Sequence, residues 1–167
     1  MTRRGVVIVL LVLVVGALFA AGAPSGQAPL RVNPLPDGWS IKQSTSKRSL
    51  QLAENSDLSA WFHLCADPAS DFNDGVDLQA YAKLIKESVA KHSKLTNRKE
   101  TELVANQLGQ LPTLEYEITG ENHGVKAHYK ITMFRVGEWY YSLSCWSTPS
   151  HWHDARPKFE ELLWHLR

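Results

Sequence analysis

Two residues in the first half of the chain, His63 and Cys65, are of types that can do nucleophilic or metal chemistry. They lie two positions apart in an apolar segment that we interpret as a β-strand, and residues two apart on a strand share one face of the sheet. An imidazole beside a thiol can activate that thiol as a nucleophile, and both groups are zinc ligands. Two ligands do not complete a metal site. An enzyme with a site near His63 and Cys65 is therefore an alternative, not the main interpretation.

The second cysteine, Cys145, offers Cys65 a different role. These are the two cysteines of the chain, and each lies near the end of a predicted strand. Two cysteines that are exported together commonly pair. We therefore predict a disulfide between Cys65 and Cys145. Two unpaired thiols buried in a sheet core are the alternative.

A further pair of candidate ligands, His151 and His153, precedes the C-terminal segment of the chain. Residues two apart on an α-helix point roughly 200° away from each other, so these histidines could share a metal ion only in an extended segment. We expect a helix start there, with Trp152 in the core. Motifs for a nucleophile elbow, a phosphate loop and a helical zinc site are all absent from the sequence. The sequence therefore predicts no catalytic residue, no metal and no cofactor.

Aromatic residues near the second cysteine suggest a binding surface instead. On the predicted strand 139–146, Tyr140 and Trp146 share one face. If helices cover only the other face of the sheet, both aromatics are exposed. They would then form a partner-binding surface together with His151 and His153 at the adjoining helix start. If both faces are covered, Tyr140 and Trp146 belong to the core; the sequence alone leaves both possibilities open.

The elements that must position these residues follow from periodicity and turn signals. An apolar stripe with Asp77 as its cap predicts a helix over 78–92. A second helix runs from Thr148-Pro149 to the end of the chain, with a kink or a later start at Pro157. Strands are predicted at 39–43, 48–53, 58–65, 100–104, 114–118, 125–133 and 139–146. The fold class is α+β, an antiparallel sheet of about six to seven strands covered by two main helices.

The N-terminus carries a targeting pattern. Arg3 and Arg4 precede an apolar run over residues 6–23. This predicts that residues 1–23 are a signal peptide or an N-terminal membrane anchor. The small residues that end the run favour cleavage, whereas Pro24 disfavours it after Ala23, so cleavage after Gly22 and an uncleaved anchor both stay open.

A flexible linker, residues 24–34, and a single domain, residues 35–167, are predicted to follow. The domain is expected outside the cytoplasm: periplasmic or secreted, or anchored by residues 6–23 as its only membrane contact. Over the whole chain, 18 Lys and Arg against 17 Asp and Glu give a net charge of +1. This near-neutral balance argues against electrostatic binding to nucleic acid, which needs a basic face.

Short motifs along the chain resemble the superfamily that joins PsbP of photosystem II, the Ran-binding Mog protein and the bacterial DcrB-like envelope proteins. The motifs are Pro36-x-Gly38-Trp39, Leu108-Gly-x-Leu-Pro-x-Leu-Glu-Tyr116, Gly137-x-Trp-Tyr-Tyr141 and Pro157-x-Phe159, in that order. The resemblance implies an α/β/α sandwich. It carries no catalytic motif, and the chain lacks the lipidation cysteine of lipoprotein members.

Together these features predict a non-catalytic accessory or binding protein of the cell envelope that engages a protein partner. The alternatives are a carrier of a small ligand or metal, and an enzyme whose site lies near His63 and Cys65.

Overall fold

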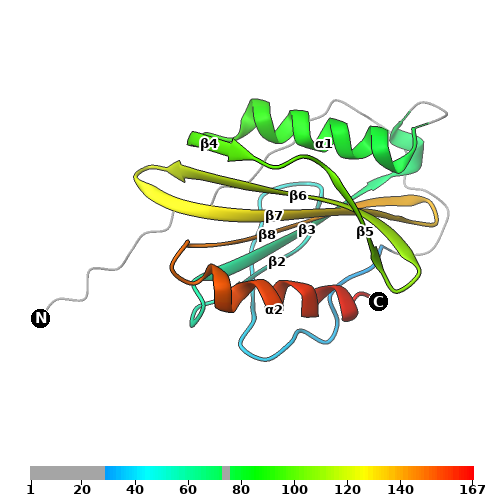
Figure 1. Cartoon of the computed structure of the whole chain (residues 1–167). Helices are drawn as coiled ribbons and strands as arrows, with labels where there is room; N and C mark the ends of the chain where they lie inside the picture. Colours follow the sequence, from blue (N-terminus) through cyan, green and yellow to red (C-terminus); the bar gives the residue numbers. More distant parts are fainter. Residues whose placement is uncertain (1–28, 73–75) are drawn as a thin grey trace, which may run out of the picture.

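The computed structural model describes residues 29–72 and 76–167, and these form an antiparallel sheet between two helices (Figure 1). The α+β fold expected from the sequence is confirmed. The predicted signal peptide or anchor, residues 1–23, lies outside the described residues. Among those that are described, no helix combines the length and the hydropathy needed to cross a membrane. In chain order the elements are β1 (Ser40–Lys42), β2 (Ser49–Asn55), β3 (Ala60–Pro68), the short 3-10 helix η1 (Ala69–Asp71), α1 (Leu78–His92), β4 (Thr96–Glu100), β5 (Val104–Leu108), β6 (Leu111–Asn122), β7 (Val125–Val136), β8 (Trp139–Ser147) and α2 (Trp152–Trp164).

The strands lie in the order β1-β2-β3-β8-β7-β6-β4, and β5 also pairs with β6. The described part of the chain thus has eight strands, one more than the upper bound of the prediction. The prediction of a single strand over 100–104 is wrong, because these residues span the break between β4 and β5. These two short strands pair with different parts of β6: Lys99 lies opposite Thr119, and Asn106 lies opposite Thr113.

Helix α1 begins and ends where the sequence predicts, because its cap and its apolar stripe agree. The carboxylate of Asp77 accepts a hydrogen bond from the backbone N–H of Ala80 at 2.7 Å, which satisfies one of the free amides of the first turn. Tyr81, Ile85 and Val89 are buried at spacings of four. This stripe packs on the face of the sheet formed by β6, β7 and β8.

Helix α2 begins at Trp152, three residues after Pro149, which the sequence predicts as its first residue. Its N-cap is His151, whose ring nitrogen Nδ1 lies 2.9 Å from the hydroxyl of Thr148. Pro157 lies inside the helix rather than at its beginning. Ala155 and Phe159 nevertheless bury their side chains on the second face of the sheet. Both faces are therefore covered, which gives the expected α/β/α layers (Figure 1).

Residues 29–34, which we predicted to be part of a flexible linker, are bound to the domain instead. Val32 is buried and forms an isolated antiparallel bridge with Leu166. The side-chain amide of Gln51 accepts from the Val32 N–H at 2.9 Å and donates to the Val32 carbonyl at 3.1 Å. These bonds give the segment a fixed position, although its prolines prevent it from joining a regular sheet.

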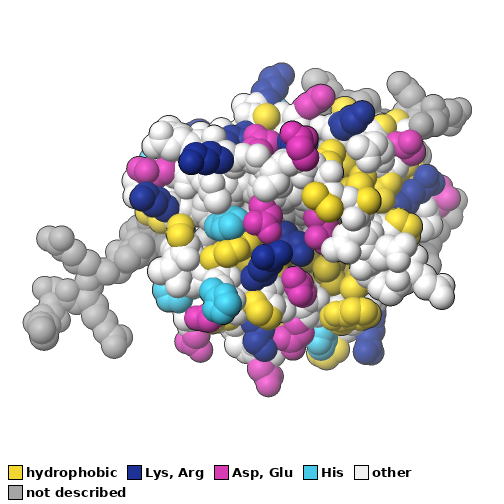
Figure 2. Space-filling view, in the orientation of Figure 1, with side chains coloured by type: hydrophobic (Ala, Val, Ile, Leu, Met, Phe, Trp, Pro, Cys, Tyr) yellow, Lys and Arg dark blue, Asp and Glu magenta, His cyan; other side chains and the backbone are white. Residues whose placement is uncertain are grey.

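The exposed surface carries charges of both signs (Figure 2). Figure 2 shows acidic and basic side chains gathered at the centre of this view, between α1 and α2. Histidines lie beside this cluster, and uncharged and hydrophobic atoms cover much of the surface on its other side.

Candidate functional site

The aromatic surface predicted on β8 is not a surface. Tyr140 is 1% exposed and Trp146 is 8% exposed, because α1 covers the face on which both side chains lie. The Tyr140 ring stacks on Tyr81 at 4.7 Å, and the Trp146 ring stacks on Trp61 at 6.1 Å. The prediction that these aromatics bind a partner is therefore wrong, and the alternative, that both faces are covered, is correct.

The two histidines assigned to the same surface do stay accessible, but elsewhere. His151 is half-buried and His153 is exposed at the start of α2, on the opposite side of the sheet from Tyr140 and Trp146. The structure therefore does not bring the four predicted partner-binding residues together.

The predicted disulfide is absent, because Cys65 and Cys145 are both free thiols. Cys145 lies opposite Phe62 in the pairing of β3 with β8, and both side chains belong to the core under α2. Cys65 is three residues further along β3, so it points to the other face, toward α1. A sheet separates the two thiols, and they cannot pair in this fold.

His63 and Cys65 do share one face, as predicted, and they are in contact. The Cys65 sulfur lies 3.4 Å from Nε2 of His63. Burial, together with the charge of Asp67, raises the pKa of Cys65 to about 12, and burial lowers the pKa of His63 to about 4. At neutral pH the thiol is therefore protonated and the imidazole neutral, the opposite of the ion pair that activates a catalytic cysteine.

The same buried cluster continues to Asp67. Its carboxylate lies 2.9 Å from the Arg48 guanidinium and accepts a hydrogen bond from the Tyr81 hydroxyl at 3.0 Å. Burial raises the pKa of Asp67, while the charge of Arg48 opposes that shift. We call these five residues (Arg48, His63, Cys65, Asp67 and Tyr81) the α1-side cluster.

The α1-side cluster leaves little room for a ligand. The cavity beside His63 and Cys65 has a volume of about 30 Å³, which is space for about one water molecule. Within residues 29–72 and 76–167, no three His, Cys, Asp or Glu side chains are arranged to hold a metal ion. The cluster is therefore an internally paired polar part of the core.

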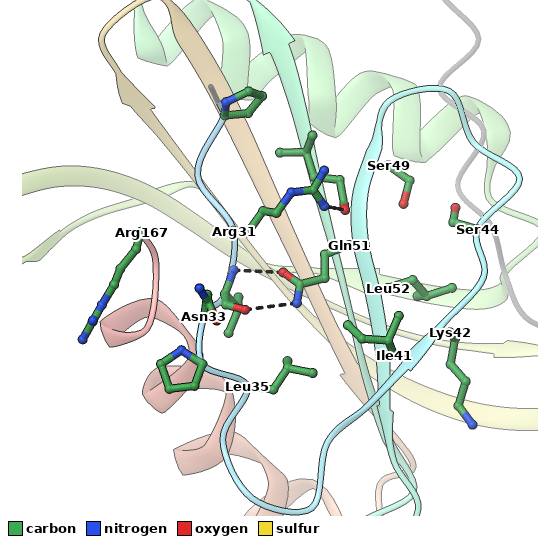
Figure 3. Close-up of a pocket in the computed structure, with 14 residues that line it drawn as sticks. Arg31, Asn33, Leu35, Ile41, Lys42, Ser44, Ser49, Gln51, Leu52 and Arg167 are labelled. Atoms are coloured by element: carbon green, nitrogen blue, oxygen red, sulfur yellow. Dashed lines mark hydrogen bonds between the residues drawn. The ribbon is translucent and has the colours of Figure 1, made fainter. Parts of the chain in front are cut away.

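A larger groove of about 730 Å³ lies between the segment 29–35 and the strands β1 and β2 (Figure 3). Its cationic side chains do not converge on a common point. Lys42 is paired with Glu54 at 2.7 Å, and the Arg31 guanidinium donates to the Leu50 carbonyl. Arg167 points away from both in Figure 3. The polar groups of this groove hold the first described residues in place.

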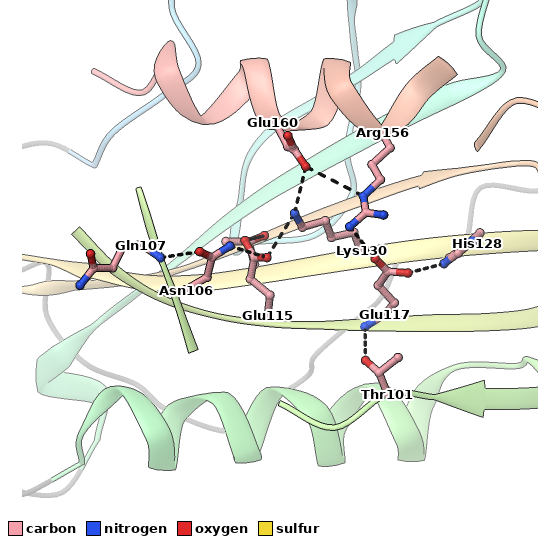
Figure 4. Close-up of polar contacts among 10 residues, drawn as sticks. Thr101, Asn106, Gln107, Glu115, Glu117, His128, Lys130, Arg156 and Glu160 are labelled. Carbon is pink, nitrogen blue, oxygen red and sulfur yellow. Dashed lines mark hydrogen bonds and ion pairs between the residues drawn. The ribbon is translucent and has the colours of Figure 1, made fainter. Parts of the chain in front are cut away.

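A network of charged side chains lies on the face of the sheet opposite α1, beside α2 (Figure 4). There β6 and β7 alternate apolar residues toward α1 with charged residues toward α2. Glu117 lies opposite Lys130 in the strand pairing. We call the following set the charged face: Glu115, Glu117, His128 and Lys130 from the sheet, with Arg156 and Glu160 from α2.

Lys130 is the centre of the charged face. Its ammonium group lies 3.2 Å from the Glu115 carboxylate and 3.8 Å from Glu160 across on α2, although its own side chain is only 9% exposed. Two carboxylates thus compensate one largely desolvated cation.

Glu117 connects the remaining members of the charged face. It lies 2.8 Å from Nε2 of His128 and 3.6 Å from the Arg156 guanidinium. The His128 ring stacks on Trp152 with centroids 3.6 Å apart. Arg156 itself is half exposed. The charged face therefore places an aromatic ring, an arginine and fixed carboxylates side by side at the surface.

The sequence did contain a signal for these residues. Glu115 and Glu117 alternate with Leu114 and Tyr116, and His128 and Lys130 alternate in the same way with Tyr129 and Ile131 on the next strand. Alignment of the two strands across the hairpin at 122–125 would have placed opposite charges in register. What the sequence could not show is that α2 leaves this part of the sheet partly open.

Comparison with known proteins bears on the fold. No protein-family model and no curated protein matches this chain. Among solved structures, cyanobacterial PsbP from Synechocystis sp. PCC 6803 matches with a TM-score of 0.57 and 10% identity, over 89% of this chain and 97% of that one.

Two further structures match at a similar level. A Pseudomonas aeruginosa protein, described as of unknown function and a putative regulator, has a TM-score of 0.54 and 10% identity over 84% of this chain and 85% of its own. A Bacteroides thetaiotaomicron protein has a TM-score of 0.53 and 14% identity over 81% of this chain and 46% of its own. The chain therefore has the PsbP-like fold that its sequence resemblance predicted.

Proposed function

We propose that this chain is a non-catalytic accessory protein of the cell envelope that binds a protein partner through the charged face. The observation that carries the proposal is the largely desolvated Lys130, held by Glu115 and Glu160. Two residues away on β7, the ring of His128 stacks on Trp152. A fixed arrangement of both charge signs around an aromatic ring is suited to a complementary protein surface.

The composition of the charged face supports a protein partner. Trp and Arg are the residue types most enriched where truncation costs the most binding energy, and Trp152 and Arg156 lie on neighbouring turns of α2. Charges held in fixed pairs select a partner of complementary potential and suppress others. Because the face contains three carboxylates, two cations and a histidine, it does not suit a polyanion such as nucleic acid.

The chemistry of the α1-side cluster supports a non-catalytic role. A protonated thiol beside a neutral imidazole, next to a cavity of one-water size, provides neither a nucleophile nor room for a substrate. The envelope location is supported by the Arg3-Arg4 and apolar pattern of the N-terminus.

The proposal is tested by capture of partners from an envelope extract with the immobilised full chain. Arg156→Glu reverses a charge on the face, next to Glu117 and Glu160. Lys158→Glu, two residues along α2, is the matched control. The side chain of Lys158 is 48% exposed, against 52% for Arg156. Among the described residues, Lys158 forms an ion pair only with Glu161.

The measurement is the amount of each captured protein by quantitative mass spectrometry. We expect a partner that is depleted with Arg156→Glu and retained with Lys158→Glu. Equal capture by both variants would show that the charged face is not the binding surface.

A further inference from the structure

Three strands border open edges of the sheet, and they differ in how those edges are protected. β1 has only three residues and ends with Lys42, and β4 carries Arg98, Lys99 and Glu100. Short strands and charges are the usual means of preventing pairing between edges. β5 (Val-Ala-Asn-Gln-Leu) has five residues, none of them charged and none a proline or glycine. It is the one edge of the described sheet without such protection.

The backbone of β5 shows which of its residues face outward. Leu108 and Leu111 close the turn to β6 over two residues, where Gly109 adopts a positive φ of 60°. The N–H of Gln107 is bonded not to β6 but to the side-chain oxygen of Asn106, at 2.8 Å. Because ladder bonds alternate along an antiparallel strand, Ala105 and Gln107 direct their backbone groups away from β6. Within the described residues β5 pairs with β6 alone.

The side chains of β5 add a second observation. Val104 is 59% exposed, which makes it one of the most exposed large apolar residues of the described chain. In Figure 1 β5 crosses in front of the other strands, and in Figure 2 the surface over this region is mainly uncharged. On the α1 side, a groove of about 670 Å³ runs along β5, lined by Ala105 and Gln107 and by the first turn of α1.

We infer that β5 pairs antiparallel with β5 of a second copy of this chain and so joins two sheets into one. In an antiparallel pair, residues whose backbone groups point outward bond to outward residues of the second strand. Outward and inward residues alternate along β5, so the two-fold axis must pass through a residue and not between two residues. With the axis at Asn106, all five residues are paired. Ala105 of each copy forms backbone hydrogen bonds with Gln107 of the other copy. The two Asn106 residues face each other.

This register is self-complementary. Val104 lies opposite Leu108 of the second copy, so each exposed valine is covered by an apolar side chain on the same face. No like charges meet along the strand, because it contains none. The bond from Gln107 to the Asn106 side chain is exchanged for a backbone bond across the interface.

The register is tested by cysteine crosslinking of the full chain. Asn106→Cys places two thiols directly opposite each other at a pair without backbone bonds, where Cα atoms are about 4.5 Å apart, within the range for a disulfide. Val104→Cys is the control, since its opposite residue is Leu108. We expect a covalent dimer on mild oxidation of Asn106→Cys and little for Val104→Cys. Equal crosslinking of both variants would overturn the register.

The strand pairing is tested separately by sedimentation equilibrium up to about 1 mM, a range suited to a small interface. Ala105→Pro removes an outward N–H but no bond to β6, and Ala105→Val retains that N–H. We expect dimerisation by the wild type and by Ala105→Val, and a loss of at least about tenfold in affinity for Ala105→Pro from the two missing bonds.

A wild type that stays monomeric would overturn the inference, as would a dimer unaffected by Ala105→Pro. The latter result would place the association at a surface other than β5. Circular dichroism of each variant verifies that it is folded. Neither experiment depends on the proposed protein partner of the charged face.

Discussion

The two faces of the sheet hold polar groups in opposite ways. On one face, α1 covers the α1-side cluster so completely that His63 and Asp67 are 5% and 2% exposed. On the other, α2 covers the strands β3 and β8 but leaves the charged face on β6 and β7 partly open, with Arg156 and Glu160 more than half exposed. His63 and Cys65, the pair whose types and spacing suggested nucleophilic chemistry, are on the closed face.

Burial explains why the residues that look reactive in the sequence differ from the polar residues that are accessible in the structure. Within the core, the charged forms of a thiol and an imidazole are disfavoured, so the Cys65–His63 contact has lost the charges that would make it reactive. The charged face pairs its ionic side chains with each other, and Arg156 and Glu160 also stay exposed to water. Contact between reactive residue types is therefore not evidence of a site unless the surroundings allow the required protonation states.

The largest effect is expected at Tyr140, one of the candidate partner-binding residues that the structure places in the core. Tyr140→Ala should lower the free energy of unfolding by about 3–5 kcal/mol, because it leaves a cavity against Tyr81 and Phe72 and removes a hydrogen bond to the Val76 carbonyl. Chemical denaturation measures the change. Trp164→Ala, at a 67% exposed position, is the control and should shift stability by less than about 0.5 kcal/mol. Equal effects would contradict the burial of Tyr140.

The next largest effect is the pH dependence caused by His63. Its pKa is about 4 in the folded protein and 6.5 in the unfolded chain, so the unfolded state binds more protons between these values. Stability therefore falls as the pH decreases from 6.5 to 4, by about 3 kcal/mol for this group. Asp67 acts with the opposite sign, because its raised pKa favours the folded state as the pH falls.

His63→Gln isolates the contribution of His63 from that of Asp67. Urea denaturation of both proteins at pH 7 and pH 4 should show the wild type losing about 3 kcal/mol more than the variant on acidification. Identical losses would mean that His63 is not buried in its neutral form.

A smaller loss is expected from Arg48, which compensates the buried Asp67. Arg48→Met should cost about 2 kcal/mol at pH 7, below the value for a fully buried pair because the arginine side chain is 20% exposed. The loss should shrink at low pH, where a protonated Asp67 no longer needs a cation. Thermal melts at pH 7 and pH 4.5 measure both effects. A loss that is the same at both pH values would contradict this pairing.

The smallest effect on stability belongs to the charged face. Arg156→Ala should change the free energy of unfolding by less than about 1 kcal/mol, because its ion pairs with Glu117 and Glu160 are long and its side chain is 52% exposed. Denaturation in urea at low and moderate salt measures this. A loss comparable to that of Arg48→Met would mean that Arg156 serves the fold rather than a partner.

The sequence predicted well where local signals agreed. Helix α1 was located at its observed bounds because the Asp77 cap and the apolar stripe point to the same residues. β4 and β5 were merged because their residues are exposed on both faces and show no alternation.

Predictions that depended on tertiary arrangement failed for a physical reason. Whether Cys65 and Cys145 share a face depends on the β3–β8 register, and whether Tyr140 is exposed depends on which faces the helices cover. Neither is a local property of the sequence.

The most direct test of the separation between the two faces compares partner capture by two variants, Arg156→Glu on the charged face and His63→Gln in the α1-side cluster. Capture from an envelope extract is quantified against the wild type, with each variant verified as folded at the pH used. If the charged face is the binding surface, Arg156→Glu should lose a partner that His63→Gln retains in full. Loss of that partner with His63→Gln and its retention with Arg156→Glu would contradict this assignment and return the function to the buried cluster.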